Sequence, residues 1–129
     1  MPGKDPAKKQ AFVVKQVSGA WGSAVQVPGT AALNAGGDAL LISVSCASAG
    51  NCSAGGRYRD GSNGEHAFVV SQVNGTWGNA VTVPAGSLVE SVSCASAGNC
   101  SAGGYYGANA FVVSQVNGTW CCAALRMPT

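Results

Sequence analysis

Six cysteines are the residues of this sequence whose type and spacing could support chemistry. Four of them form two copies of one pattern, in which five residues separate the two thiols: Cys46 with Cys52, and Cys94 with Cys100. Zinc sites use closer ligand spacings with a second pair nearby, and redox sites use Cys-x-x-Cys, so no metal or redox site is predicted. Cysteines that flank a short hairpin loop can face each other on adjacent strands. We therefore predict a structural disulfide within each pair, with free buried thiols as the alternative.

The remaining cysteines and the chain start bear on where the protein resides. Cys121 and Cys122 are neighbours, so a bond between them would be strained, and they are expected to be free or to link chains. Repeated cysteine pairs are typical of oxidising compartments, which places the parent protein outside the cell or at the cell surface. Residues 1–10 are basic without an apolar segment of signal-peptide length, so no signal peptide is predicted in this chain. No apolar run approaches the roughly 20 residues of a membrane-spanning helix.

The ionisable residues form no recognisable catalytic arrangement. His66 is the single histidine, and its place at a loop–strand junction is typical of a solvated side chain. The carboxylates recur at no equivalent positions, which argues against the paired carboxylates of glycoside hydrolases. They are Asp5, Asp38, Asp60, Glu65 and Glu90. The sequence therefore assigns no catalytic residue and no cofactor, and a non-catalytic role is favoured over an enzymatic one.

Composition excludes several classes of protein. Charged residues make up 9% of the 129 residues, against roughly 25% in a typical soluble protein. The net charge of +2 is too small to indicate a nucleic-acid partner. Apolar residues make up 47%, which excludes a disordered polar chain.

Internal repeats organise the sequence. The block 43–56 recurs without change at 91–104, and the block 67–77 recurs without change at 110–120, with a looser copy at 11–21. The connector between the two blocks has ten residues in the first repeat and five in the second, as expected for an exposed loop. A period of about 40–50 residues is that of four-stranded propeller blades or of helical pairs. The Val, Ser and Gly content and the lack of a 3.6-residue periodicity favour strands.

Each repeat can be divided into four strands. We expect them at 42–48, 52–59, 66–73 and 76–83, with Asn74-Gly75 as a hairpin turn. The segment Phe68-Val69-Val70 is apolar on both faces, so both faces of its sheet must be covered. Stacking of successive sheets provides that cover, and the small residues of the first two strands permit close approach. The predicted fold class is therefore all-β, built from four-stranded antiparallel meanders stacked as β-propeller blades.

The blade assignment divides the chain into segments. A basic N-terminal segment, 1–10, precedes the repeat region, 11–120. That region holds a partial blade at 11–28, a full blade at 40–84 and a partial blade at 88–120. A divergent tail, 121–129, follows and is interpreted as out of frame with the repeat.

The repeat residues resemble bacterial β-propeller repeats of the kelch and Asp-box kinds. Kelch blades carry a double glycine, then aromatic residues, then a tryptophan, an order matched by Gly55-Gly56-Arg57-Tyr58 with Trp77 and by Gly103-Gly104-Tyr105 with Trp120. The turn 71–77 lies where an Asp-box would, although it uses Asn and is tighter. The Ser-Cys-x5-Cys-x-Ala-Gly element resembles one in repeats of exported actinobacterial-type proteins. The resemblance covers 11–120 and implies two to three propeller blades of an exported bacterial protein.

The connector that varies between repeats is the candidate ligand-contact surface, since repeat proteins often bind partners through per-repeat variation on one face. Its candidate contact residues are tyrosines and arginines, which are favoured at interfaces. They are Arg57, Tyr58, Arg59, Tyr105 and Tyr106. The alternative is that these loops merely tolerate change.

The expected function is a non-catalytic scaffold or binding module for a protein or carbohydrate ligand. The alternative is a fragment of a propeller enzyme that acts on glycans, a hydrolase or lyase whose active residues lie outside this chain. A third alternative is a reading frame without a selected role. The sequence accounts for nine strands, fewer than the roughly 16 of a four-bladed ring. We therefore expect either a fragment, which is favoured, or a homo-oligomer that completes the propeller.

Overall fold

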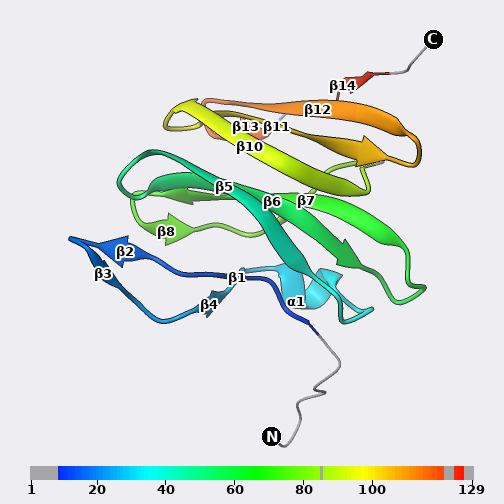
Figure 1. Ribbon diagram of the computed structural model, residues 1–129, viewed down its shortest axis with the longest axis horizontal. Helices are drawn as coiled ribbons and strands as arrows, with labels where there is room; N and C mark the ends of the chain where they lie inside the picture. Colours follow the sequence, from blue (N-terminus) through cyan, green and yellow to red (C-terminus); the bar gives the residue numbers. More distant parts are fainter. Residues whose placement is uncertain (1–8, 85, 121–123, 127–129) are drawn as a thin grey trace, which may run out of the picture.

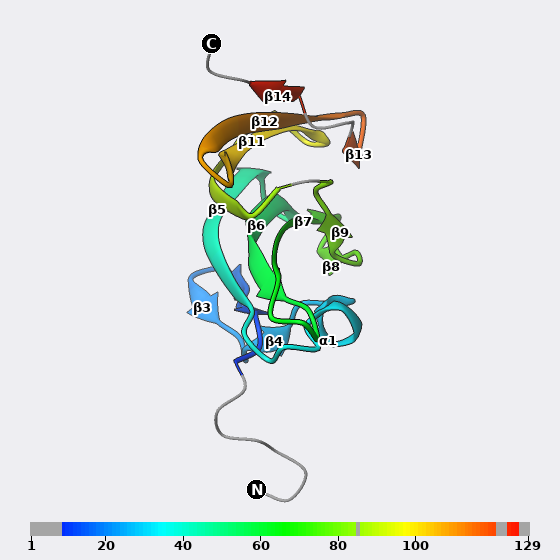
Figure 2. The ribbon, with the colours of Figure 1, turned by 90° about the vertical axis from the view of Figure 1, so that its right-hand side faces the viewer.

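The computed structural model describes residues 9–84, 86–120 and 124–126. Two antiparallel sheets are stacked face to face, with a smaller N-terminal unit of short strands and one helical turn packed against the first sheet (Figure 1). The view along the side of the stack separates these layers, with β3 and β4 at one end and β12 and β14 at the other (Figure 2). The described residues are thus all-β apart from that helical turn, as the sequence predicts.

The first sheet follows the expected order of strands. It consists of β5 (Leu40–Ser48), β6 (Asn51–Arg59), β7 (Glu65–Val73), β8 (Thr76–Trp77) and β9 (Val81–Thr82). Neighbours pair in chain order, β5-β6-β7-β8, and β9 also pairs with β7. Asn74 and Gly75 both have positive φ, 49° and 87°, which confirms the hairpin turn that the Asn-Gly pair predicts.

The second sheet repeats this topology. It consists of β10 (Leu88–Ser96), β11 (Asn99–Tyr106), β12 (Asn109–Val116), β13 (Thr119–Trp120) and β14 (Ala124–Arg126). Its strand order is β10-β11-β12-β13, with β14 paired to β12. The repeated blocks therefore fold as like sheets.

The expected strand at 76–83 is interrupted in the structure. The amide of Gly78 donates to the carbonyl of Ser71, and the amide of Ala80 donates to the carbonyl of Pro28 in the N-terminal unit. Because the Ala80 amide pairs outside the sheet, the ladder to β7 stops at Trp77 and resumes at Val81. The single predicted strand is thus two short strands.

The N-terminal unit contains only the outer strands of a repeat among the described residues. It consists of β1 (Phe12–Val13), β2 (Gln16–Val17), β3 (Ala20–Trp21), β4 (Val25–Gln26) and the helical turn α1 (Thr30–Leu33). β1 pairs with β4, and β2 pairs with β3. This pairing corresponds to that of β7 with β9 and β8 in the first sheet.

The centre of the first sheet is buried on both sides. Phe68 and Val70 belong to one core with Val13 of the N-terminal unit, whereas Ala67 and Val69 belong to another with residues of the second sheet. All four of these β7 residues are at most 1% exposed. The expectation that this strand needs cover on both faces is confirmed.

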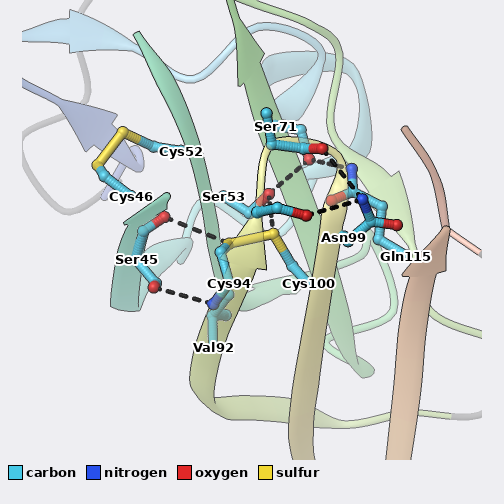
Figure 3. The surroundings of a disulfide bond; sticks show 12 residues. Ser45, Cys46, Cys52, Ser53, Ser71, Val92, Cys94, Asn99, Cys100 and Gln115 are labelled. Carbon is cyan, nitrogen blue, oxygen red and sulfur yellow. Dashed lines mark hydrogen bonds between the residues drawn. A yellow bond between two sulfur atoms is a disulfide. The ribbon is translucent and has the colours of Figure 1, made fainter. Parts of the chain in front are cut away.

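Small residues allow the two sheets to approach closely. Ser43 Oγ accepts the amide of Val92 at 3.0 Å. Ser45 Oγ accepts the amide of Cys94 at 3.1 Å (Figure 3). β10 therefore docks on β5 through backbone-to-serine hydrogen bonds. The sheets stack, but no closed ring or barrel forms among the described residues, so the propeller stays a prediction.

Replacement of Gly55 by Ala should destabilise the fold. A Cβ at this position would overlap the Val89 side chain, with the Val89 Cβ at 2.9 Å and Val92 Cγ2 at 3.3 Å. Overpacking of this kind costs about 1–3 kcal/mol in unfolding free energy, to be measured by chemical denaturation.

Gly103→Ala is the matched control for Gly55→Ala. Gly103 occupies the same place in the identical block 91–104, but the nearest atom to its added Cβ is 3.7 Å away. The unfolding free energy of the Gly103→Ala variant should be unchanged or raised by up to about 1 kcal/mol. Equal losses in the two variants would contradict the stacked arrangement.

Candidate binding groove

An open groove of about 940 Å³ lies between the N-terminal unit and the first sheet. Its lining includes Val44 and the Cys46–Cys52 disulfide on the side of the first sheet, and Phe12 and Trp21 on the side of the N-terminal unit. Lys15 is the only charged residue among the described residues that line it. The groove is therefore predominantly apolar.

The groove exposes one copy of a repeated surface, and the other copy of this surface, in the second sheet, is covered. Val44 and Cys46 of β5 correspond to Val92 and Cys94 of β10, which pack against the first sheet. Val92 is buried, whereas Val44 is 61% exposed. The sequence of 43–56 is identical to that of 91–104, so the difference comes from the neighbouring unit alone. In the N-terminal unit, the described residues include no counterparts of β5 and β6 to cover the surface.

Backbone amides of β5 at the groove lack the hydrogen-bond acceptors that the equivalent amides of β10 have. Within the described part of the chain, no serine hydroxyl accepts the amides of Val44 and Cys46. β1 and β2 each pair with one strand, whereas the corresponding β7 pairs on both edges. An unpaired strand edge is a template for another extended chain.

Both cysteine pairs are disulfides. Cys46 lies opposite Cys52 in the β5–β6 pairing, and Cys94 lies opposite Cys100 in the β10–β11 pairing. The two loops they close are short, so each disulfide stabilises the fold by about 2 kcal/mol in the chain-entropy model. Disulfides fit an extracellular protein. Cys121 and Cys122 lie outside the described residues.

The arginines of the predicted contact loop are engaged within the chain. The Arg57 guanidinium lies 3.2 Å from a carboxylate oxygen of Asp38 and 3.3 Å from one of Glu65. Arg59 lies 3.3 Å from the same Asp38 oxygen and 3.8 Å from the same Glu65 oxygen. Burial raises the pKa of Asp38, but the hydrogen bond and charge of Arg57, the hydrogen bond of Arg59 and the charge of Lys9 outweigh it and leave that pKa lowered. The two positive charges are thus neutralised at this end of the first sheet.

The tyrosines of the predicted contact loop divide between core and surface. Tyr58 is buried, and its hydroxyl lies 2.9 Å from Thr82 Oγ1. Tyr105 is partly exposed on β11, and Tyr106 packs against the core between the two sheets. Arg57, Tyr58 and Arg59 lie on β6 of the first sheet, and the other two lie on β11 of the second. A role for them in ligand contact stays a prediction.

His66 has a partner that its place in the sequence does not reveal. Its Nε2 lies 2.7 Å from Asp60 Oδ2, and its ring stacks on Tyr58 with centroids 5.1 Å apart. Asp60 Oδ1 accepts the amides of Ser62 and Gly64, both at 2.8 Å. The hydrogen bond from His66, followed by those from the two amides, lowers the pKa of Asp60. This cluster closes the connector between β6 and β7.

The groove is not among the features predicted from the sequence. One signal was present: the block 43–56 recurs at 91–104 with the same apolar positions, and the given sequence holds no third copy ahead of the block at 11–21. No cluster of three or more histidine, cysteine or acidic side chains suited to a metal occurs in the described ranges. α1 is far too short to cross a membrane, and no other helix occurs among residues that the structure describes. Comparison of the chain with protein-family models, curated proteins and solved structures finds no match.

The two disulfides should differ in reactivity although their loops are identical. Cys46 is exposed beside the groove, whereas Cys100 is only 5% exposed beneath the neighbouring sheet. Because thiol attack requires access to sulfur, a limiting reductant should open Cys46–Cys52 first in the native protein. Differential alkylation followed by peptide mass mapping measures the order. In denaturant the two rates should become equal; equal rates in the native protein would contradict the difference in burial.

Asp60→Asn should lower stability at neutral pH. A carboxylate with a lowered pKa in the folded state stabilises the fold above its unfolded pKa of about 3.9, and this contribution is lost as pH falls through the folded pKa. The stability difference from the wild type should therefore disappear at strongly acidic pH. Urea denaturation at several pH values tests this, with the exposed Glu90→Gln as control. A difference independent of pH would assign the effect to the turn rather than to the charge.

Proposed function

We propose that this chain is a non-catalytic repeat module of an exported bacterial protein, and that it binds an extended polypeptide segment in the groove beside β5. The observation that carries the proposal is the pair of identical surfaces. The hairpin β5–β6 packs on the copy of this surface in β10–β11, while the copy in β5–β6 itself is open. A segment with the shape and chemistry of that hairpin therefore fits the open copy.

The chemistry of the groove favours polypeptide over carbohydrate. Its lining is mainly apolar, and Lys15 is the single charged side chain among the described lining residues. Carbohydrates present many hydroxyls, and these would find few hydrogen-bond partners in an apolar groove. An extended chain instead satisfies its backbone on the unpaired edges of β1 and β2 and inserts alternate side chains into the groove, which is the physics of β-strand addition.

We further propose that the two sheets are successive blades of a propeller. The interface between the N-terminal unit and the first sheet is formed by residues at the same repeat positions as those in the interface between the two sheets. Val13 and Phe68 meet in the first core as Val69 and Phe111 do in the second. Repetition of one interface with a fixed rotation is how blades are arranged about an axis. The two disulfides support the proposed export.

A labelled synthetic peptide tests the binding proposal. The probe is the hairpin Leu40–Arg59 with its disulfide formed, and fluorescence anisotropy against the 129-residue chain measures affinity. Val44→Lys places a charge in the groove and should weaken binding by about tenfold or more.

Val25→Lys is the matched control for the binding experiment. Val25 is 55% exposed, similar to Val44, and does not line the groove. It should bind the peptide as the wild type does. No binding by the wild type, or equal loss in both variants, would overturn the proposal, and binding of labelled oligosaccharides in its place would assign the groove to carbohydrate.

A further inference from the structure

The outer face of the second sheet is a copy of a face that is buried inside the molecule. On this outer face, β12 presents Ala110, Val112 and Ser114, and all three are exposed. Their counterparts in β7 are Ala67, Val69 and Ser71, which the second sheet covers. The same side chains in the same order thus occur once with a partner sheet and once without.

The covering side of that internal interface is well defined. Phe111 and Val113 pack with Ala67 and Val69 in the core between the sheets. Gln115 Nε2 and Trp120 Nε1 both donate to Ser71 Oγ, each at 3.0 Å (Figure 3 shows the first of these). Since that oxygen accepts two hydrogen bonds, its own proton is directed to Ser53 Oγ at 2.8 Å. A Phe-Val-Gln-Trp set therefore recognises an Ala-Val-Ser set.

The N-terminal unit carries the same recognising set on its own outer face. Phe12, Val14, Gln16 and Trp21 occupy the positions of Phe111, Val113, Gln115 and Trp120 in the repeated block. All four are exposed, and Phe12 is 59% exposed whereas Phe111 is 1% exposed. One chain thus presents the Ala-Val-Ser set at one end of the stack and the Phe-Val-Gln-Trp set at the other (Figure 2). The described N-terminal unit has no counterparts of β10 and β11, so the contact between copies would be made by this set alone.

We propose that copies of this chain associate head to tail through these two faces. Phe12 and Val14 of one copy pack on Ala110 and Val112 of the next, and Gln16 and Trp21 donate hydrogen bonds to Ser114. The contact is heterologous, so each added copy leaves one free face of each kind. Association therefore continues until the rotation between copies closes a ring, or it extends as an open filament.

Complementary single variants test the proposal. Val112→Lys blocks the outer face of the second sheet, and Phe12→Lys blocks the outer face of the N-terminal unit. Light scattering coupled to size exclusion should show the wild type growing in mass with concentration, and each variant alone at the 12.7 kDa of one chain. An equimolar mixture of the two should form a dimer and no larger species, because each variant retains the face that the other has lost.

Two further valines provide matched controls, one on the strand of Val112 and one in the N-terminal unit. Val116 lies on β12, on the same face as Val112, and is 56% exposed. Its counterpart Val73 remains 55% exposed even though the second sheet covers the face on which it lies, so this position is outside the contact. Val17 is 60% exposed and occupies the equivalent position in the N-terminal unit. Val116→Lys and Val17→Lys should associate as the wild type does. Circular dichroism establishes that every variant is folded.

The outcomes separate the proposal from its alternatives. A wild type that stays monomeric at the highest soluble concentration overturns it. Dimers of Val112→Lys alone, or a mixture that stays monomeric, overturn the head-to-tail geometry. The set is repeated in a Cys121→Ser, Cys122→Ser background, so that an intermolecular disulfide cannot produce the dimer. The N-terminal face also borders the groove, through Phe12 and Trp21, whereas Val44 is on neither face. Val44→Lys should therefore lose the peptide and still associate, which distinguishes failure of the association from failure of the groove proposal.

Discussion

A β-strand made of consecutive apolar residues leaves water only when both faces of its sheet are covered. Phe68, Val69 and Val70 impose this requirement at the centre of the first sheet, and each is at most 1% exposed. A lone sheet of this repeat cannot satisfy it, so the units must stack. Stacking in turn needs small residues where the sheets meet, which is the role of Gly55 and of the serines that accept the amides of β10. The layered architecture follows from this one requirement.

Identical sequences in different surroundings are the source of the surfaces that this protein leaves open. Val44 and Val92 lie in identical blocks, yet one borders a groove and the other lies in a core. Val69 and Val112 differ in the same way at the opposite face. An exposed surface that is known to pack well against a defined partner within the same molecule has a predictable chemistry. This is the basis on which we propose an extended chain in the groove and a like unit at the ends of the stack.

The charged residues contribute to closure of the loops. Arg57 and Arg59 reach Asp38, which precedes β5, and Glu65, which begins β7. Asp60 and His66 close the connector itself. In a chain with few charges, these pairs hold together one end of the first sheet, while the apolar groove lies between that sheet and the N-terminal unit.

Features that depend on near neighbours in the chain could be predicted from the order of the residues. The all-β class, the positions of most strands, the Asn-Gly turns and the cysteine pairing all arise from residues within a few positions of one another, where side-chain alternation and turn conformation act directly. The interruption at 78–80 was not predictable in this way, because the Ala80 amide pairs with Pro28 far away in the chain. The partners of Arg57, the burial of Tyr58 and the groove beside Val44 were likewise decided by the tertiary structure alone. Two identical blocks carry the same local information, so only the placement of distant units decides which copy is covered and which remains open to a partner.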